Sequence, residues 1–152
     1  MAYFNTSITF YCCTVWGAEI FRVSSNPVRV FQGSDAFFQW TIKKDLISHP
    51  DFRGVVFGIW KNGYVASYLL SVTKNGRIVL NSGLKDEAPH LADRVQWKGD
   101  LSKSSVAFQI SHVSAQDQVE YGLCLEYGAL KGSQSDSLSL KVEGNCHTDR
   151  FN

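Results

Sequence analysis

Short stretches in which apolar and polar residues alternate run along most of this chain. In residues 105–113, Val106, Phe108 and Ile110 alternate with small or polar residues. A period of two is typical of a strand with one buried face. Similar stretches predict further strands at 19–31, 35–42, 55–60, 66–73, 77–80, 94–97, 117–125 and 135–142. We therefore expect an all-β fold.

Turn residues separate several of these stretches. Asn-Gly pairs at 62–63 and 75–76 lie between short apolar runs, and such pairs are strong signals for β-hairpins. Pro27 interrupts the first stretch and is expected to break it into two halves at a sheet edge, where a missing N–H donor costs little. The polar stretches 43–54 and 128–132 are expected to be loops.

Three residues in the second half of the chain carry a family resemblance. Arg94 opens the first of two strands, Asp117 ends the loop after the second, and Tyr121 follows four residues later. This order resembles strands D, E and F of an immunoglobulin variable-type (V-set) domain, in which the Tyr forms a tyrosine corner. The resemblance implies a V-type β-sandwich of Greek-key topology. It also implies that Arg94 pairs with Asp117 and that the Tyr121 hydroxyl bonds back to the loop backbone.

The chain departs from that family at its inter-sheet disulfide. The two family cysteines correspond here to Trp40 and Leu123, so we expect an apolar contact between these residues in place of the disulfide. Cys124 falls one place later and therefore on the opposite face of its strand. A bond between Cys124 and Cys146 is a weaker alternative, because the hairpin register is expected to put Cys124 opposite a residue near position 140.

Composition fits one folded domain without chemical machinery. The 152 residues are 44% hydrophobic, 13% aromatic and 19% charged, which suffices for a core. The net charge of +1 and the lack of a basic cluster argue against nucleic-acid binding. The cysteines and histidines lack metal-ligand spacing, and no nucleophile motif is present. We expect no catalytic residue, no cofactor and no metal, and therefore not an enzyme.

Both ends differ from the middle of the chain. Residues 1–18 carry no charged side chain and end in Gly17-Ala18, which predicts a secretory signal and an extracellular protein. The competing interpretation is an apolar N-terminal arm. Residues 19–143 would form the domain, and 144–152 a polar tail or the start of a linker. No apolar run of 18 residues occurs, so we expect no membrane insertion by this chain.

One sheet is expected to present an unusually apolar outer surface. The strands predicted at 55–60 and 66–73 are apolar on both sides, whereas an antiparallel sandwich normally exposes a polar face. Exposed aromatic patches of this kind mark interfaces. Either Phe57 or Trp60 must point outward, and the sequence leaves open which; cover by the 43–54 loop or the tail is the alternative. The expected partner-binding residues are Trp60, Phe57, Tyr68, Glu126 and Tyr127.

A narrower resemblance suggests a function. The absent disulfide, the Asp-x-x-x-Tyr corner, the turn at 97–101 and the long segment between strands C and D resemble membrane-distal domains of the allorecognition receptors of colonial hydroids. The resemblance implies a cell-surface adhesion and immunity domain that binds a protein partner, plausibly a copy of itself, through its G-F-C-C′ sheet. It also implies a longer, membrane-anchored receptor. Two other classes stay open: a secreted ligand or decoy of a different receptor, and a carbohydrate-binding sandwich using Trp97 beside Asp100.

Overall fold

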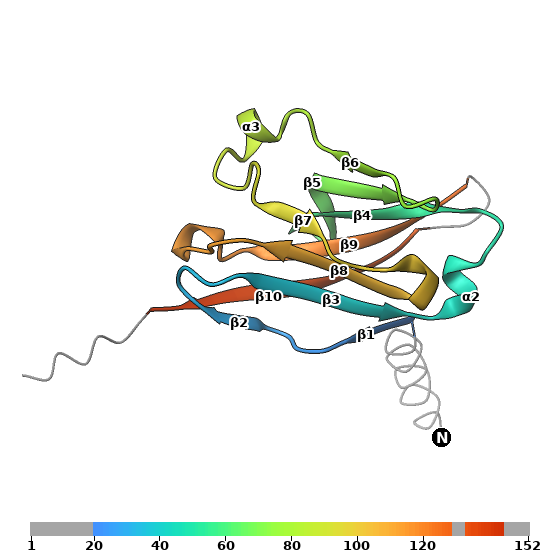
Figure 1. Cartoon of the computed structure of the whole chain (residues 1–152), viewed down its shortest axis with the longest axis horizontal. Coiled ribbons are helices and arrows are strands. Elements are labelled where there is room, and N and C mark those ends of the chain that lie inside the picture. The colour runs from blue at the N-terminus through green and yellow to red at the C-terminus, as the bar shows by residue number, and fades with distance from the viewer. Residues whose placement is uncertain (1–19, 129–132, 145–152) are drawn as a thin grey trace, which may run out of the picture.

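The computed structural model describes residues 20–128 and 133–144, which form two packed β-sheets (Figure 1). The strands are β1 (Phe21–Val23), β2 (Val28–Phe31), β3 (Ala36–Ile42), β4 (Phe52–Lys61), β5 (Tyr64–Thr73), β6 (Ile78–Leu80), β7 (Val95–Trp97), β8 (Ser105–Ile110), β9 (Glu120–Tyr127) and β10 (Gln134–Glu143). Short helical turns connect some of them: α2 (Lys44–Ile47), α3 (Leu84–Glu87), η1 (Leu101–Lys103) and η2 (Ala115–Asp117). The predicted all-β sandwich is confirmed. The predicted signal segment and the tail beyond residue 144 lie outside the described residues.

Strands that are distant in the sequence lie side by side in both sheets. The four-stranded sheet has the order β1-β3-β8-β7, and the six-stranded sheet has the order β2-β10-β9-β4-β5-β6. Strand β2 pairs with β10 in parallel, and the other pairings are antiparallel. The chain changes sheets between β1 and β2, around Pro27, so the predicted break in the first strand is present.

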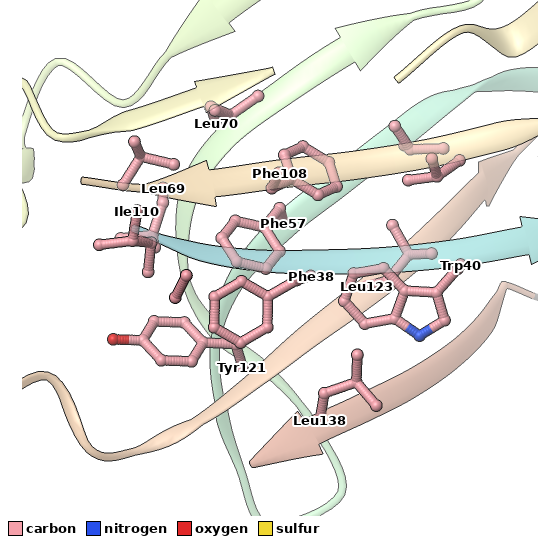
Figure 2. Close-up of a cluster of buried hydrophobic side chains, with 14 of the residues drawn as sticks. Phe38, Trp40, Phe57, Leu69, Leu70, Phe108, Ile110, Tyr121, Leu123 and Leu138 are labelled. Carbon is pink, nitrogen blue, oxygen red and sulfur yellow. The ribbon is translucent and has the colours of Figure 1, made fainter. Parts of the chain in front are cut away.

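Aromatic rings pack against one another between the sheets, among many aliphatic side chains (Figure 2). Phe57 is fully buried and stacks on Phe108, with ring centroids 4.3 Å apart and planes 9° apart. Tyr121 lies on its other side, at 5.7 Å and 11°. These rings bury large apolar areas, which is the main favourable contribution to folding. The orientation of β4 is thereby fixed: Phe57 points into the core.

Trp40 and Leu123, the residues expected to replace an inter-sheet disulfide, both lie in the core. Both side chains are completely buried and neighbour each other in the core (Figure 2). The Trp40 indole Nε1 also donates a hydrogen bond of 2.9 Å to Asp136 Oδ2 on β10, a partner that the sequence did not suggest. A buried indole N–H needs such an acceptor, so Asp136 is what allows a tryptophan to take this position.

The segment 43–54 is more ordered than the sequence suggested. It contains helix α2, and β4 begins at Phe52, whose side chain is only 2% exposed. The prediction of a polar loop through Gly54 is therefore wrong. Gly54 lies inside β4. Only a glycine fits there, because a Cβ would stand 2.3 Å from the carbonyl oxygen of Val72 on β5. This glycine marks a close approach of two backbones rather than the end of a loop.

The two predicted Asn-Gly turns are present. Asn62 and Gly63 join β4 to β5 with φ angles of 55° and 85°, as a type I′ turn requires. Gly76, with φ of 82°, lies in the turn from β5 to β6. These hairpins place β4, β5 and β6 next to one another and so build the outer surface described below.

Candidate interaction surface

The predicted ion pair between Arg94 and Asp117 lies at one end of the sandwich. Asp117, which is fully buried, accepts hydrogen bonds at Oδ2 from Arg94 Nη2 at 2.6 Å and from Nη1 at 3.1 Å. The backbone N–H of Ser114 donates to the same oxygen at 2.9 Å. Oδ1 faces His90, whose Nε2 is 3.9 Å away. Arg94 and Asp117 therefore form the predicted pair. The pair connects the start of β7 to the η2 turn before β9.

The tyrosine corner is also present. The Tyr121 hydroxyl donates to the backbone carbonyl of Asp117 at 2.8 Å, and the side chain is fully buried. Burial raises the pKa of Tyr121 well above its ordinary value of 10.0, and the nearby Asp117 carboxylate raises it further. The folded chain thus keeps a proton that the unfolded chain loses in alkaline solution.

We expect this proton to make stability fall at high pH. Below pH 10, Tyr121 makes its full contribution to the free energy of unfolding. Above pH 10, this contribution falls by up to about 1.4 kcal/mol per pH unit. Tyr121→Phe should cost about 1 kcal/mol near pH 7, through the lost hydrogen bond. Its stability should then decline less steeply than that of the wild type between pH 10 and 11, in urea unfolding. Parallel curves would contradict the assignment.

The outer face of the six-stranded sheet is hollowed over its central strands. Residues from β4, β5 and β9 surround a shallow depression of about 380 Å³, and they are Val56, Val65, Ala66, Tyr68, Ser71, Cys124 and Glu126. Tyr68 is 39% exposed, and Glu126 supplies a carboxylate. The depression is therefore lined by both apolar and polar groups.

A glycine on β9 shapes the surface beside this depression. Gly122 on β9 leaves room for the Trp60 indole, since a Cβ at Gly122 would stand 2.3 Å from Trp60 Cε3. The indole thus packs against the sheet itself and is half-buried. Val65 contacts the same site, its Cγ2 lying 3.1 Å from that Cβ position. Trp60 and Val65 therefore lie side by side on the outer face, next to the depression.

Two residues expected on this face are elsewhere. Phe57 is in the core, as described above. Tyr127 has the same strand parity as Leu123 and Leu125, which are both buried, and it lies at the end of the sandwich. Its hydroxyl donates to the Leu46 carbonyl of α2 at 2.9 Å, and its ring meets Phe52 edge-on. The prediction of Phe57 and Tyr127 as partner-binding residues of the outer face is wrong.

Sequence reasoning missed several residues of the depression. Val56, Val65 and Ser71 were not named. Two irregularities in the β4–β5 pairing add an unpaired residue each to β5, Leu69 and Ala66, and so change its alternation. The irregularities fall after Phe57 and after Ile59. Helix α2 does not cover this face, because its Leu46 and Ile47 side chains pack against the core.

Cys124 lies in the depression as a half-buried free thiol. Burial raises its pKa, which keeps it protonated and unreactive at neutral pH. On β10 it pairs with Ser135 rather than with a residue near position 140, so the expected register was wrong. Cys146 lies outside the described residues.

A second hollow, of about 350 Å³, lies between the β5–β6 turn and η1. It contains Trp97 and Asp100, the residues considered for carbohydrate binding. The Trp97 ring is half-buried and meets Phe108 edge-on at 5.1 Å. Asp100 Oδ1 accepts hydrogen bonds from the Ser102 backbone N–H at 3.0 Å and from its hydroxyl at 2.6 Å, and these bonds lower the pKa of Asp100. Both side chains thus serve the local fold.

Comparison with known proteins gives no family for this chain. No model of a known protein family matches it, and a search of curated proteins finds no significant match. Among the described residues, no helix is long and apolar enough to cross a membrane.

Proposed function

We propose that residues 20–143 form a variable-type immunoglobulin domain that recognises a protein partner, namely a second copy of itself. The two strand orders support this fold. In family terms, β1-β3-β8-β7 corresponds to A-B-E-D, and β10-β9-β4-β5-β6 corresponds to G-F-C-C′-C″. The role is non-catalytic recognition at the cell surface, within a longer membrane-anchored receptor.

The observation that carries the proposal is the shallow depression on β4, β5 and β9, with the exposed Tyr68 in its lining. Val65 and Tyr68 line it, and the Trp60 indole lies beside Val65 over Gly122. Tyr and Trp supply much of the binding energy in protein interfaces, and open, shallow apolar surfaces suit another protein surface. On the neighbouring β10, the outward side chains include only short serines at 135, 137 and 139 beside the depression. A partner can therefore approach the central strands closely.

Charge permits a second copy as that partner. The net charge of the chain is only +1, so two copies repel each other little. The face itself combines one carboxylate, Glu126, with an otherwise neutral lining. Two such faces can meet through their apolar centres while Glu126 stays in the solvated rim.

Sedimentation velocity at rising concentration tests this proposal. Wild-type chain should self-associate, and Tyr68→Glu should weaken the association at least about tenfold, because it puts a charge in the apolar centre. Phe37→Glu is the matched control: Phe37 is 53% exposed on β3, in the opposite sheet. It should associate as the wild type does.

The outcomes separate the candidate roles. Equal association of wild type and Tyr68→Glu would refute recognition through this face. A strict monomer that binds a different receptor through the same face would instead favour the secreted ligand or decoy.

A further inference from the structure

The edge strand β6 is unusually apolar and open. Its three residues, Ile78, Val79 and Leu80, are 49%, 38% and 56% exposed. The strand is the last of the six-stranded sheet and lies at the upper rim of the molecule (Figure 1). Soluble proteins normally protect such edges with lysine, proline, a bulge or a covering element. Within β6 none of these residues is present.

The hydrogen-bond ladder shows which backbone groups of β6 face outward. Thr73 N–H donates to the Arg77 carbonyl at 2.9 Å, and Asn81 N–H donates to the Leu69 carbonyl at 3.1 Å. In an antiparallel pair, hydrogen-bonded and non-hydrogen-bonded residue pairs alternate. Arg77 and Asn81 belong to bonded pairs, so Val79, which lies opposite Ser71, belongs to one as well. The N–H and C=O groups of Ile78 and Leu80 therefore point away from β5. They find no hydrogen-bond partner among the described residues.

We propose that β6 pairs with β6 of a second copy as an antiparallel strand, which joins the six-stranded sheets of two copies edge to edge. A two-fold axis at Val79 places Ile78 of each copy opposite Leu80 of the other. In this register each Ile78/Leu80 pair exchanges both backbone hydrogen bonds, giving about four in all. A two-fold axis at Ile78 or at Leu80 would allow about half as many backbone hydrogen bonds between the two β6 strands. The register centred on Val79 is therefore the favoured one.

The side chains fit the same register. Ile78 and Leu80 lie opposite Val72 and Leu70, and so share the inward parity of the sheet. Across the two-fold axis, Ile78 of one copy would neighbour Leu80 of the other, and apolar cross-strand pairs of this kind are stabilising. A hollow of about 150 Å³ adjoins Leu80 on this side, lined in part by Leu84, Ala92 and Val95. This hollow would receive the Ile78 side chain of the second copy, which the pairing places next to Leu80.

This edge contact is distinct from the face contact proposed above. It uses backbone groups of β6, whereas the face contact uses side chains on β4, β5 and β9. Because β6 is short, the contact is small and weak, and its test requires concentrations up to about 1 mM.

Residue-resolved amide exchange by NMR on the full chain tests the edge pairing. Val79 should be protected at every concentration, since it is bonded to β5. Ile78 and Leu80 should exchange quickly at about 10 µM, and their exchange should slow several-fold toward about 1 mM as paired molecules accumulate. Rates that do not change with concentration would overturn the proposal. Complete protection at 10 µM would do so too, because it would assign the edge to another segment of the same chain.

Variants distinguish this edge contact from the face contact. Leu80→Pro removes only an outward N–H, which an edge strand tolerates, and should abolish the concentration-dependent protection of Ile78. Ile78→Lys gives an independent block, with protection read at Leu80, should the proline variant fail to fold. Tyr68→Glu should keep the protection of Ile78 and Leu80 while losing the face contact. Loss of that protection in Tyr68→Glu, or its persistence in both edge variants, would overturn the edge pairing without deciding the face proposal.

Discussion

Replacing Arg94 by alanine is expected to lower the free energy of unfolding by about 3–5 kcal/mol, because it leaves the Asp117 carboxylate buried without its counter-charge. Asp117 is fully buried, and both Arg94 terminal nitrogens donate to its Oδ2. A domain of this size is stable by only about 5–15 kcal/mol, so the variant should lose a large part of its stability. Urea unfolding followed by tryptophan fluorescence measures the change.

Arg94→Lys is the matched control for this prediction. Lysine keeps the positive charge but cannot provide the planar pair of donors, so we expect an intermediate loss. Arg29 offers a surface comparison: it pairs with Glu143 at 3.6 Å, and its side chain is 57% exposed. Arg29→Ala should cost less than about 1 kcal/mol. Equal losses in Arg94→Ala and Arg29→Ala would show that the buried pair has no special importance.

Replacing Phe57 by alanine is the second large effect, also expected to be about 3–5 kcal/mol. Its ring is fully buried between Phe108 and Tyr121, and truncation leaves a cavity that two packed sheets cannot close. The same urea experiment provides the measurement.

Trp60 is the natural control for Phe57, since the two residues lie on opposite faces of β4. Trp60→Ala should destabilise clearly less, because the indole is only half-buried on the outer face. It should also weaken self-association, which Phe57 does not contact directly. A larger loss of stability for Trp60→Ala than for Phe57→Ala would contradict the observed orientation of β4.

The features that depended on local chemistry could be predicted from the sequence. Asn62-Gly63 specifies a turn by its backbone preferences, and Pro27 interrupts a strand through its missing donor. Arg94 and Asp117 were identified through a spaced pattern whose members indeed meet. Each of these signals is contained within a few residues or within one family pattern.

The features that depended on packing could not be predicted. Strand β4 is apolar on both sides, so alternation could not decide between Phe57 and Trp60. Gly54 has the composition of a loop, although its position is set by the approach of Val72 on β5. The partner of Trp40, Asp136, is 96 residues away in the chain. Such contacts follow from the sheet order, which no short pattern encodes.

The exposure of β6 also escaped the sequence analysis. Residues 77–80 were predicted as a strand, but an apolar run does not reveal whether another strand lies beyond it. Only the sheet order shows that β6 is at the edge. An exposed apolar edge such as β6 is therefore recognised from the structure, by its backbone hydrogen bonds to β5 and by the exposure of its side chains.

The most direct test of the central claim is aggregation of beads that display many copies of the chain, which strengthens a weak contact through multivalency. Beads carrying wild-type chain or Phe37→Glu should cluster with their own kind, and beads carrying Tyr68→Glu should stay dispersed. That result would support self-recognition through the outer face of β4, β5 and β9. Clustering of Tyr68→Glu beads to the wild-type extent, or dispersion of wild-type beads at every density, would contradict it.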